Sequence, residues 1–235
     1  MTREKLLKIA KPSQPLHIDK IKTIIKGNAT VFRKVIKFPD GLTGGDIVGK
    51  SGDKDDPLGL MYACGIKRPP CNKGDILYIK EPWCQYSKLD DYDQVIEDTE
   101  KYYYRADGEN PTPFNTFLIP KDGYDEYLYY PIWKSSIHMP KEVARVFIYI
   151  KDVNVERLQN ITDDQAKLEG VIKDPYDYQP NVWYEQRKEF VCHYEKAQFA
   201  GWWETTIKRS DRDKYGWDAN PWVWVIEFER IEIDG

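Results

Sequence analysis

Alternating apolar and polar positions predict four strands in this chain. Residues 30–38, TVFRKVIKF, alternate and are rich in branched and aromatic side chains, which is typical of a strand. Residues 76–81 follow a Gly-Asp turn and predict a second strand that ends before Pro82. The longest alternating stretch, residues 144–158, predicts the central strand of the sheet. A last strand over residues 220–233 would place on one face the side chains of Trp222, Trp224, Ile226 and Phe228.

Helical spacing marks three further segments. Apolar residues recur at helical intervals over residues 18–25, and Gly27 is placed to end that helix. Thr162 and Gln165 form a capping-box pattern at the start of a short helix that Gly170 ends. A third helix is predicted by the spacing of Phe199, Trp202, Trp203, Thr206 and Ile207. Strands in irregular order with few helices predict an α+β fold, built on a curved mixed sheet or a small β-barrel with flanking helices.

The domain organisation predicted from the sequence is simple. Residues 1–14 have the composition of a charged tail, and residues 15–235 suit one large domain. An acidic, tyrosine-rich insertion interrupts this domain at about residues 84–131. Within it, YYYRADG at residues 102–108 predicts a short strand that runs into an Asp-Gly turn. Residues 40–58 are rich in glycine and aspartate and indicate a loop.

Charge is distributed unevenly along the chain. The net charge is −4, but residues 1–50 hold eleven Lys and Arg against four Asp and Glu, whereas residues 81–130 hold four against twelve. Aromatic side chains are dense, with 17 Tyr, 8 Trp and 8 Phe, and such rings stack on flat ligands as well as fill cores. A basic region beside an acidic one suits a protein that meets phosphate at one place. Chance clustering on a solvated surface is the alternative.

Hydropathy, known motifs and cysteine spacing argue against a secreted, membrane, cofactor-binding or metal-binding protein. No apolar run is long enough for a signal sequence or a membrane span, so we expect a cytoplasmic protein with reduced thiols and no membrane partner. No phosphate-binding loop, dinucleotide fingerprint or zinc-protease motif occurs, and no cofactor is predicted. No metal site is predicted either, because the close pairs of zinc ligands are missing among Cys64, Cys71, Cys84 and Cys192.

Five blocks of sequence carry a resemblance to known proteins. They span residues 73–83, 103–108, 133–145, 153–171 and 216–231. Blocks of this kind occur in this order in a group of phage and prophage proteins, and they resemble the ASCH family, a branch of the PUA-like superfold. The resemblance extends from about His17 to Ile231. It implies a PUA-like β-barrel with helices at its ends, a cleft suited to RNA or nucleotides, and a location in the cytosol of a bacterial host.

The ASCH resemblance also implies where a catalytic centre would lie. In small bacterial amidohydrolases of the family, which deacetylate acetylated cytidine, a lysine and the second threonine of a G-x-K-T-x-T-x-R block are catalytic, with a glutamate further on. This chain reads GNATVFRK over residues 27–34, so Ala29 replaces the lysine and Phe32 the second threonine. An alanine methyl group cannot activate a nucleophile. We therefore expect that this chain lacks the hydrolytic mechanism of those relatives.

The same block retains residues that suit phosphate binding. Thr30, Arg33 and Lys34 remain, and the two cations are candidates for phosphate contact, with a solvated strand edge as the alternative. Because neighbouring residues of a strand point to opposite faces, only one of the two cations is expected to face a cleft.

Glu81 is a second candidate, at the end of an apolar strand and beside Trp83. A carboxylate in this position can accept hydrogen bonds from a base, or act as a general base if burial raises its pKa. The alternative is an internal ion pair with Arg33 or Arg145, since buried acids are usually paired.

Two further segments combine aromatic and polar side chains. WKSSIHMP at residues 133–140 precedes the central strand, where hydrogen-bond donors are typical of ligand-binding loops. We interpret it as one wall of a site rather than a structural loop, because of Lys134, Ser135, Ser136 and His138. The turn YGWDANPW at residues 215–222 suits base stacking as well as a capped turn, through Trp217, Asp218 and Asn220.

Three functions are compatible with these residues. The favoured one is a non-catalytic RNA- or nucleotide-binding module of a phage or prophage. The second is an amidohydrolase or nuclease on modified nucleosides or RNA, with Glu81 or His138 in the catalytic role. The third is a phage assembly or interaction protein, since the aromatic insertion is a possible interface. Ala29 and Phe32 favour the first function over the second, and the retained cations favour it over the third.

Overall fold

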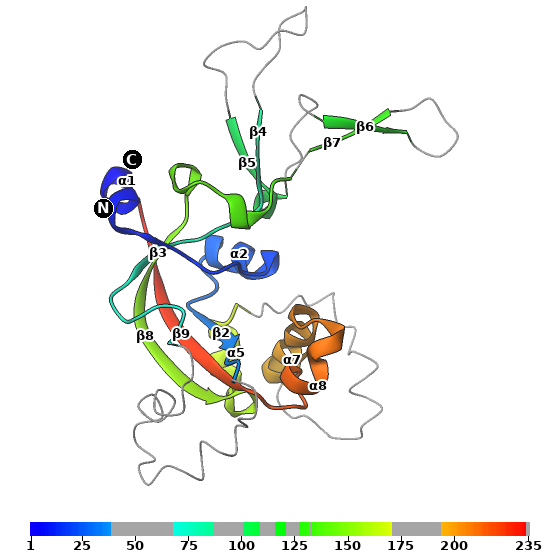
Figure 1. The fold of residues 1–235 in the computed structure, drawn as a ribbon. Coiled ribbons are helices and arrows are strands. Elements are labelled where there is room, and N and C mark those ends of the chain that lie inside the picture. The colour runs from blue at the N-terminus through cyan, green and yellow to red at the C-terminus, as the bar shows by residue number, and fades with distance from the viewer. Residues whose placement is uncertain are drawn as a thin grey trace, which may run out of the picture. The chain divides into compact units, whose positions relative to one another are not determined.

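The computed structural model describes residues 1–38, 68–86, 101–108, 116–120, 127–131, 133–170 and 194–233 (Figure 1). The loop expected at residues 40–58, much of the insertion, and the cysteines Cys64 and Cys192 lie outside these residues. None of the described helices is both long and apolar enough to cross a membrane.

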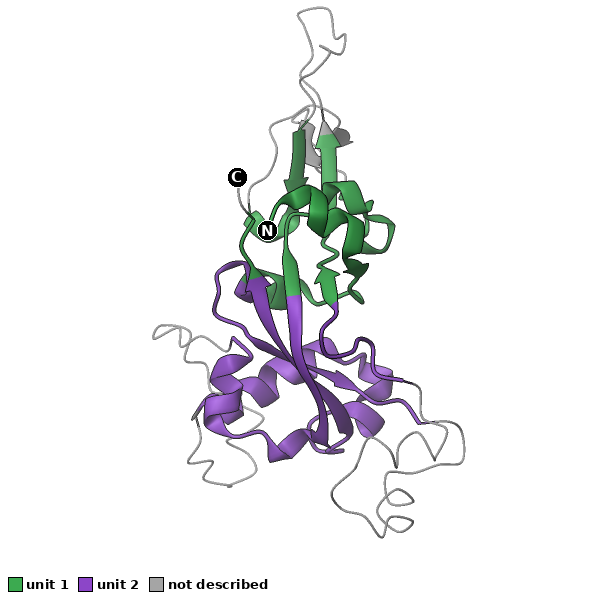
Figure 2. Cartoon of the chain, turned by 90° about the vertical axis from the view of Figure 1, so that its left-hand side faces the viewer, with its two compact units in different colours: residues 1–22, 76–148, 231–235 green, residues 23–75, 149–230 purple. Residues whose placement is uncertain are grey.

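The backbone groups into two compact units, which Figure 2 distinguishes by colour. Unit 1 holds residues 1–22, 76–148 and 231–235, and unit 2 holds residues 23–75 and 149–230. The interpretation of residues 15–235 as one domain stays a prediction.

Five strands form one sheet in the order β1-β3-β8-β9-β2. β1 pairs with β3 in parallel, and β2 pairs with β9 antiparallel, so the sheet is mixed. The expected α+β class with a mixed sheet is therefore confirmed. Among the described strands the sheet is open, with β1 and β2 at its edges, and not the closed small barrel that was the alternative. The strand bounds are Lys11–Pro12 (β1), Val31–Val35 (β2), Ile76–Tyr78 (β3), Phe147–Arg157 (β8) and Trp222–Ile231 (β9).

Two hairpins and several helices complete the described structure. β4 pairs with β5, and β6 pairs with β7, both antiparallel. The hairpin strands are Trp83–Tyr86 (β4), Lys101–Tyr104 (β5), Thr116–Pro120 (β6) and Tyr127–Pro131 (β7). The α-helices are Arg3–Ile9 (α1), Ile18–Ile25 (α2), Asp163–Leu168 (α5), Tyr194–Thr206 (α7) and Arg212–Tyr215 (α8). Short 3₁₀ turns cover Arg105–Asp107, Ser136–His138, Lys141–Val143, Leu158–Asn160 and Arg209–Asp211.

The two long strands lie next to each other in the sheet, and β8 is its central strand, as the alternation of residues 144–158 predicts. β9 is apolar on both faces, because residues 223–226 are all buried. Val223 and Val225 belong to a core cluster with Phe199 of α7, while Phe228 lies 5.8 Å from the ring of Phe32 on β2. A strand covered on both faces needs apolar residues at consecutive positions.

Unit 2 builds its core from α5 and α7 against the sheet. The expected capping box at Thr162 and Gln165 is present, because each residue's side chain accepts a hydrogen bond from the other's backbone N–H. Gly170 follows the helix with a φ of +82°, which confirms its predicted role as the stop signal. The side chain of Phe199 is fully buried and contacts the rings of Trp202, Trp203 and Trp217.

Unit 1 begins where the sequence suggested a charged tail. Residues 3–9 form α1, and Leu6 is fully buried in a cluster with Tyr78 and Phe147. β1 then adds a short parallel edge to β3, and the buried Ser13 accepts a hydrogen bond from the backbone of Lys80. Leu6 and Ala10 are buried in this cluster and Leu7 packs against it, so the segment is an apolar anchor as well as a charged one.

We expect Gly170→Ala to destabilise the protein more than Gly74→Ala. Both glycines have positive φ, which costs an alanine about 1 kcal/mol. An added Cβ at Gly170 would lie only 2.7 Å from the Thr23 Cβ, whereas at Gly74 nothing lies within 4 Å. Chemical denaturation should show at least about 1 kcal/mol of additional loss at Gly170. Equal losses would contradict this packing.

Candidate functional site

The candidate residues fall into two groups. Unit 1 holds Glu81, Trp83, Lys134, Ser135, Ser136, His138 and Arg145, and unit 2 holds Thr30, Arg33, Lys34, Trp217, Asp218 and Asn220. Each group is described within its own unit.

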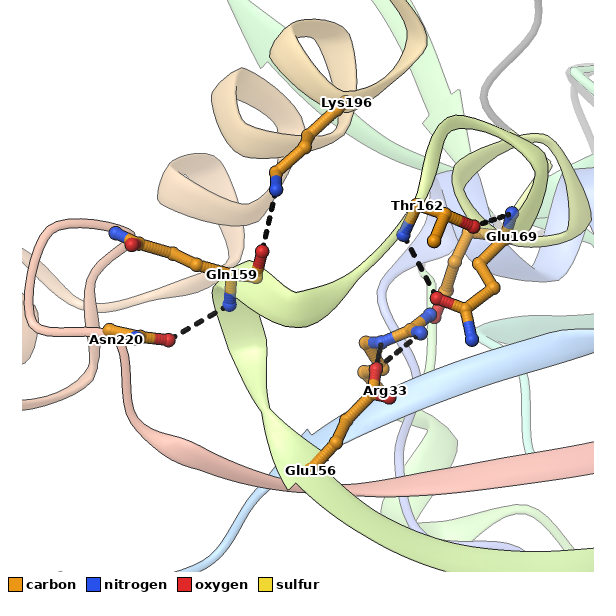
Figure 3. Close-up of polar contacts among 8 residues, drawn as sticks. Arg33, Glu156, Gln159, Thr162, Glu169, Lys196 and Asn220 are labelled. Carbon is orange, nitrogen blue, oxygen red and sulfur yellow. Dashed lines mark hydrogen bonds and ion pairs between the residues drawn. The ribbon is translucent and has the colours of Figure 1, made fainter. Parts of the chain in front are cut away.

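Arg33 is the centre of a buried ion-pair cluster in unit 2 (Figure 3). Its Nε and Nη2 donate to Oε1 of Glu156 at 3.0 and 2.6 Å, and its Nη1 donates to Oε1 of Glu169 at 2.8 Å. The side chains of Arg33 and Glu169 are fully buried, and the guanidinium lies 5.8 Å from the Phe199 ring. Arg33 therefore joins β2 to β8 and to the end of α5, and its described contacts leave it poorly placed for external phosphate.

The rest of the segment at residues 27–34 is also built into the fold. Ala29 is 3% exposed and Phe32 is 6% exposed, so both side chains lie in the interior. Thr30 is exposed, and its backbone N–H donates to Leu168 while its carbonyl accepts from Phe228. Lys34 is half-buried, and burial, followed by the nearby charge of Lys37, lowers its pKa.

The turn at residues 215–222 is a capped structural turn. Trp217 is buried in the core of unit 2, whereas Asp218 is exposed. Asn220 has a φ of +43°, and its Oδ1 accepts a hydrogen bond from the Gln159 backbone at 2.8 Å (Figure 3). Lys196 donates to the Gln159 carbonyl at 2.6 Å. These hydrogen bonds support the interpretation of the segment as a capped turn.

A second cluster of charges lies in unit 1, around Arg145. Its Nε and Nη2 donate to the two carboxylate oxygens of Glu81, each at 2.9 Å, and its Nη1 and Nη2 donate to Asp107 at 2.7 Å. Glu81 is fully buried, so burial raises its pKa, and the hydrogen bond and charge of Arg145 oppose this shift. Of the two arginines considered as ion-pair partners of Glu81, the partner is therefore Arg145 and not Arg33.

Aromatic rings and cations alternate on one face of the β4–β5 hairpin. Trp83 pairs with Tyr104 across the hairpin and with Lys134 on its other side, so these three side chains share a face. The Lys134 ammonium lies 4.6 Å from the Trp83 ring centre, and the Arg145 guanidinium lies 3.9 Å from that of Tyr104. Tyr102, two residues from Tyr104, has its ring 5.9 Å from that of Trp83 and is 45% exposed. We call Lys134, Trp83, Tyr104 and Tyr102 the hairpin face.

The segment at residues 133–140 is partly structural and partly exposed. Met139 is buried and its sulfur accepts the backbone N–H of Glu81, while Ser135 caps the following 3₁₀ turn. Lys134 and His138 are exposed, and Ser136 is half-buried. The segment therefore anchors the hairpin face through its core residues and presents its polar side chains to solvent.

Several residues of these clusters were not among the sequence candidates. Tyr104 and Asp107 complete the surroundings of Arg145, and Glu156 and Glu169 complete those of Arg33. Tyr102 and Tyr104 were recognisable as a strand within YYYRADG, and alternation placed them on one face. The identity of the facing residues depends on strand register, which one sequence does not reveal.

The described residues contain no group of three or more His, Cys, Asp or Glu side chains that could hold a metal ion. Comparison of the chain with protein-family models, with curated proteins and with solved structures found no match. The assignment of a function therefore depends on the residues themselves.

We expect Arg145→Ala to destabilise the protein in a pH-dependent way. Removal of Arg145 leaves Glu81 as a buried carboxylate without its partner, at a cost of about 3 kcal/mol at neutral pH. Loss of Arg145 also removes the two effects that lower the pKa of Glu81, so this pKa rises further. A group with a raised folded-state pKa contributes stability at low pH that is lost as pH rises.

The deficit of Arg145→Ala relative to the parent should thus be smaller at about pH 5 than at about pH 8, as measured by urea denaturation. Lys134→Ala serves as the control, because it removes an exposed cation that stacks on Trp83 and leaves no buried carboxylate. A deficit that is independent of pH would argue against an ionised Glu81.

Proposed function

We propose that this chain is an ASCH-type, PUA-like protein of a phage or prophage that binds single-stranded RNA or a nucleotide without catalysing its turnover. The five sequence blocks support the family, and an α+β fold on a mixed sheet is compatible with it. A bacterial cytosol follows from the same resemblance.

The hairpin face is the observation that carries this proposal. Tyr102 offers an exposed ring on the β4–β5 hairpin, and the exposed Lys134 lies on the same face. Exposed aromatic rings beside cations are the features on which single-stranded nucleic acids stack and place their phosphates. The Glu81, Asp107 and Tyr104 contacts fix Arg145 beneath this face, so Arg145 orients the site and does not bind phosphate directly.

Binding without turnover is supported by the two sites where catalysis would be expected. Ala29 and Phe32 occupy the positions of the family's lysine and second threonine, and both are buried. Both oxygens of Glu81 accept hydrogen bonds from Arg145, which leaves this carboxylate poorly suited to activate a water molecule.

We expect the parent protein to bind a short single-stranded RNA in fluorescence anisotropy, with affinity that falls as salt rises. Lys134→Ala should reduce the salt slope by about one released ion, because one phosphate contact is lost. Tyr102→Leu should weaken binding by about 1–3 kcal/mol with little change in slope, because a stacked base loses its partner.

Two matched controls accompany these variants. Lys73→Ala removes an exposed lysine of unit 2, and Tyr149→Leu removes an exposed tyrosine of β8. Equal effects from the controls, or a failure of the parent to bind RNA, single-stranded DNA or nucleotides at low salt, would refute the proposal and favour an interaction protein.

We also expect no measurable deacetylation of acetylated cytidine by the parent or by Ala29→Lys. A lysine at position 29 would enter an interior site, and Phe32 would still pack against Phe228 where a threonine is needed. A chromatographic assay for cytidine is sufficient, with thermal denaturation to check that the variant folds. Robust turnover by the parent would instead establish the amidohydrolase alternative.

A further inference from the structure

Arg33, Arg145 and Arg157 are all partly or fully buried, and their positive charges have different partners. Arg33 donates to two carboxylates, from Glu156 and Glu169. Arg145 also donates to two carboxylates, as described above. Arg157 donates to a backbone carbonyl and has no carboxylate partner among the described residues.

Arg157 is nevertheless held in one position. Its guanidinium lies 4.6 Å from the ring centre of Trp222, and its Nη1 donates to the Asn220 carbonyl at 3.1 Å. Burial lowers the pKa of Arg157, with no charge nearby that opposes this shift. The Nε and Nη2 donors, which form one edge of the planar group, have no acceptor among the described residues. Such an edge matches two oxygens of an oxyanion.

Asn220, whose carbonyl accepts the hydrogen bond from Arg157, carries a further donor in its side-chain amide. Its left-handed backbone is fixed by a hydrogen bond from its own N–H to the Trp217 carbonyl at 3.0 Å. The Gln159 backbone N–H donates to Oδ1 of Asn220, so this oxygen is the acceptor and the amide nitrogen is left as a donor. Figure 3 shows Asn220 and Gln159 in this arrangement.

We propose that Arg157, together with the amide of Asn220, forms a binding site for a phosphate group. The proposal goes beyond the hairpin face and does not depend on it, because all its residues belong to unit 2. The phosphate is that of a free nucleotide or of a nucleic-acid backbone, which share this chemistry.

The chemistry favours phosphate over a carboxylate. A carboxylate presents two oxygens in one plane and is saturated by the free edge of Arg157. A tetrahedral phosphate presents at least two more acceptor directions, one of which the Asn220 amide can serve. Arginine held flat on an aromatic ring keeps its fork preorganised for such contacts.

The first test separates a ligand-binding arginine from a structural one. Arg157→Met keeps the apolar stem over Trp222 and removes a charge that has no carboxylate partner, so the melting temperature should be unchanged or higher. Arg33→Met, by contrast, should lower the melting temperature markedly, because Glu156 and Glu169 lose their cation. A loss in Arg157→Met as large as that in Arg33→Met would overturn the proposal.

The second test measures binding at the site. Inorganic phosphate is titrated into the ¹⁵N-labelled full chain, and the indole N–H signal of Trp222 is followed after assignment with Trp222→Phe. We expect a saturable shift whose affinity falls about tenfold or more in Arg157→Met. Arg157→Lys should also weaken binding, since lysine keeps the charge but not the fork. Lys151→Met, which removes an exposed cation from the same strand, should bind phosphate like the parent.

Parallel titrations identify the source of the phosphate. Tighter binding of adenosine monophosphate indicates a nucleotide, and tighter binding of an oligonucleotide without terminal phosphates indicates a nucleic-acid backbone. Equal affinity for acetate, no saturable shift, or an equal loss in Lys151→Met would overturn the proposal. A chain that fails to bind RNA through Tyr102 and Lys134 but binds phosphate through Arg157 would refute only the proposed function of the hairpin face.

Discussion

A buried guanidinium requires anions around it, and this constraint organises both units of the protein. Taking a charge out of water costs several kcal/mol unless hydrogen-bonded partners replace the solvent. Arg33 meets the requirement with Glu156 and Glu169, which ties an edge strand to the central strand and to the end of a helix. Arg145 meets it with Glu81 and Asp107. Arg157 lacks such partners among the described residues, and for this reason it stands out as a site for an external anion.

The hairpin face shows how one arginine can stabilise a surface without taking part in it. Arg145 lies against Tyr104, and Tyr104 in turn donates a hydrogen bond to the Val143 carbonyl. Trp83 is buried beside them, and only Tyr102 and Lys134 extend into solvent. Packing against buried neighbours restricts the exposed ring and cation, which lowers the entropic cost of ordering them around a ligand.

Residues 27–34, which resemble the catalytic block of the ASCH family, lie partly in the interior of unit 2. Ala29 and Phe32 are interior residues, and Arg33 forms ion pairs with Glu156 and Glu169. This segment thus contributes to the core of unit 2. Any ligand-binding role must then fall to other residues, and the exposed side chains of the hairpin face and the donors around Arg157 are the ones the described structure offers.

The sequence by itself determined the longer elements of the sheet and its helices, namely β2, β3, β8, β9, α2, α5 and α7, but not α1 or β1. Alternation in residues 144–158, the capping box at Thr162 and the glycine at position 170 act through local sterics and hydrogen bonds, which neighbouring residues control. For Glu81 the sequence left two interpretations open, a role in a site or an ion pair with Arg33 or Arg145. Only the tertiary structure decided that the partner is Arg145, that Arg33 is buried, and that Leu6 anchors the first helix. Those contacts join residues that are far apart in the chain. Which residues meet depends on strand register and packing, and a local sequence pattern specifies neither.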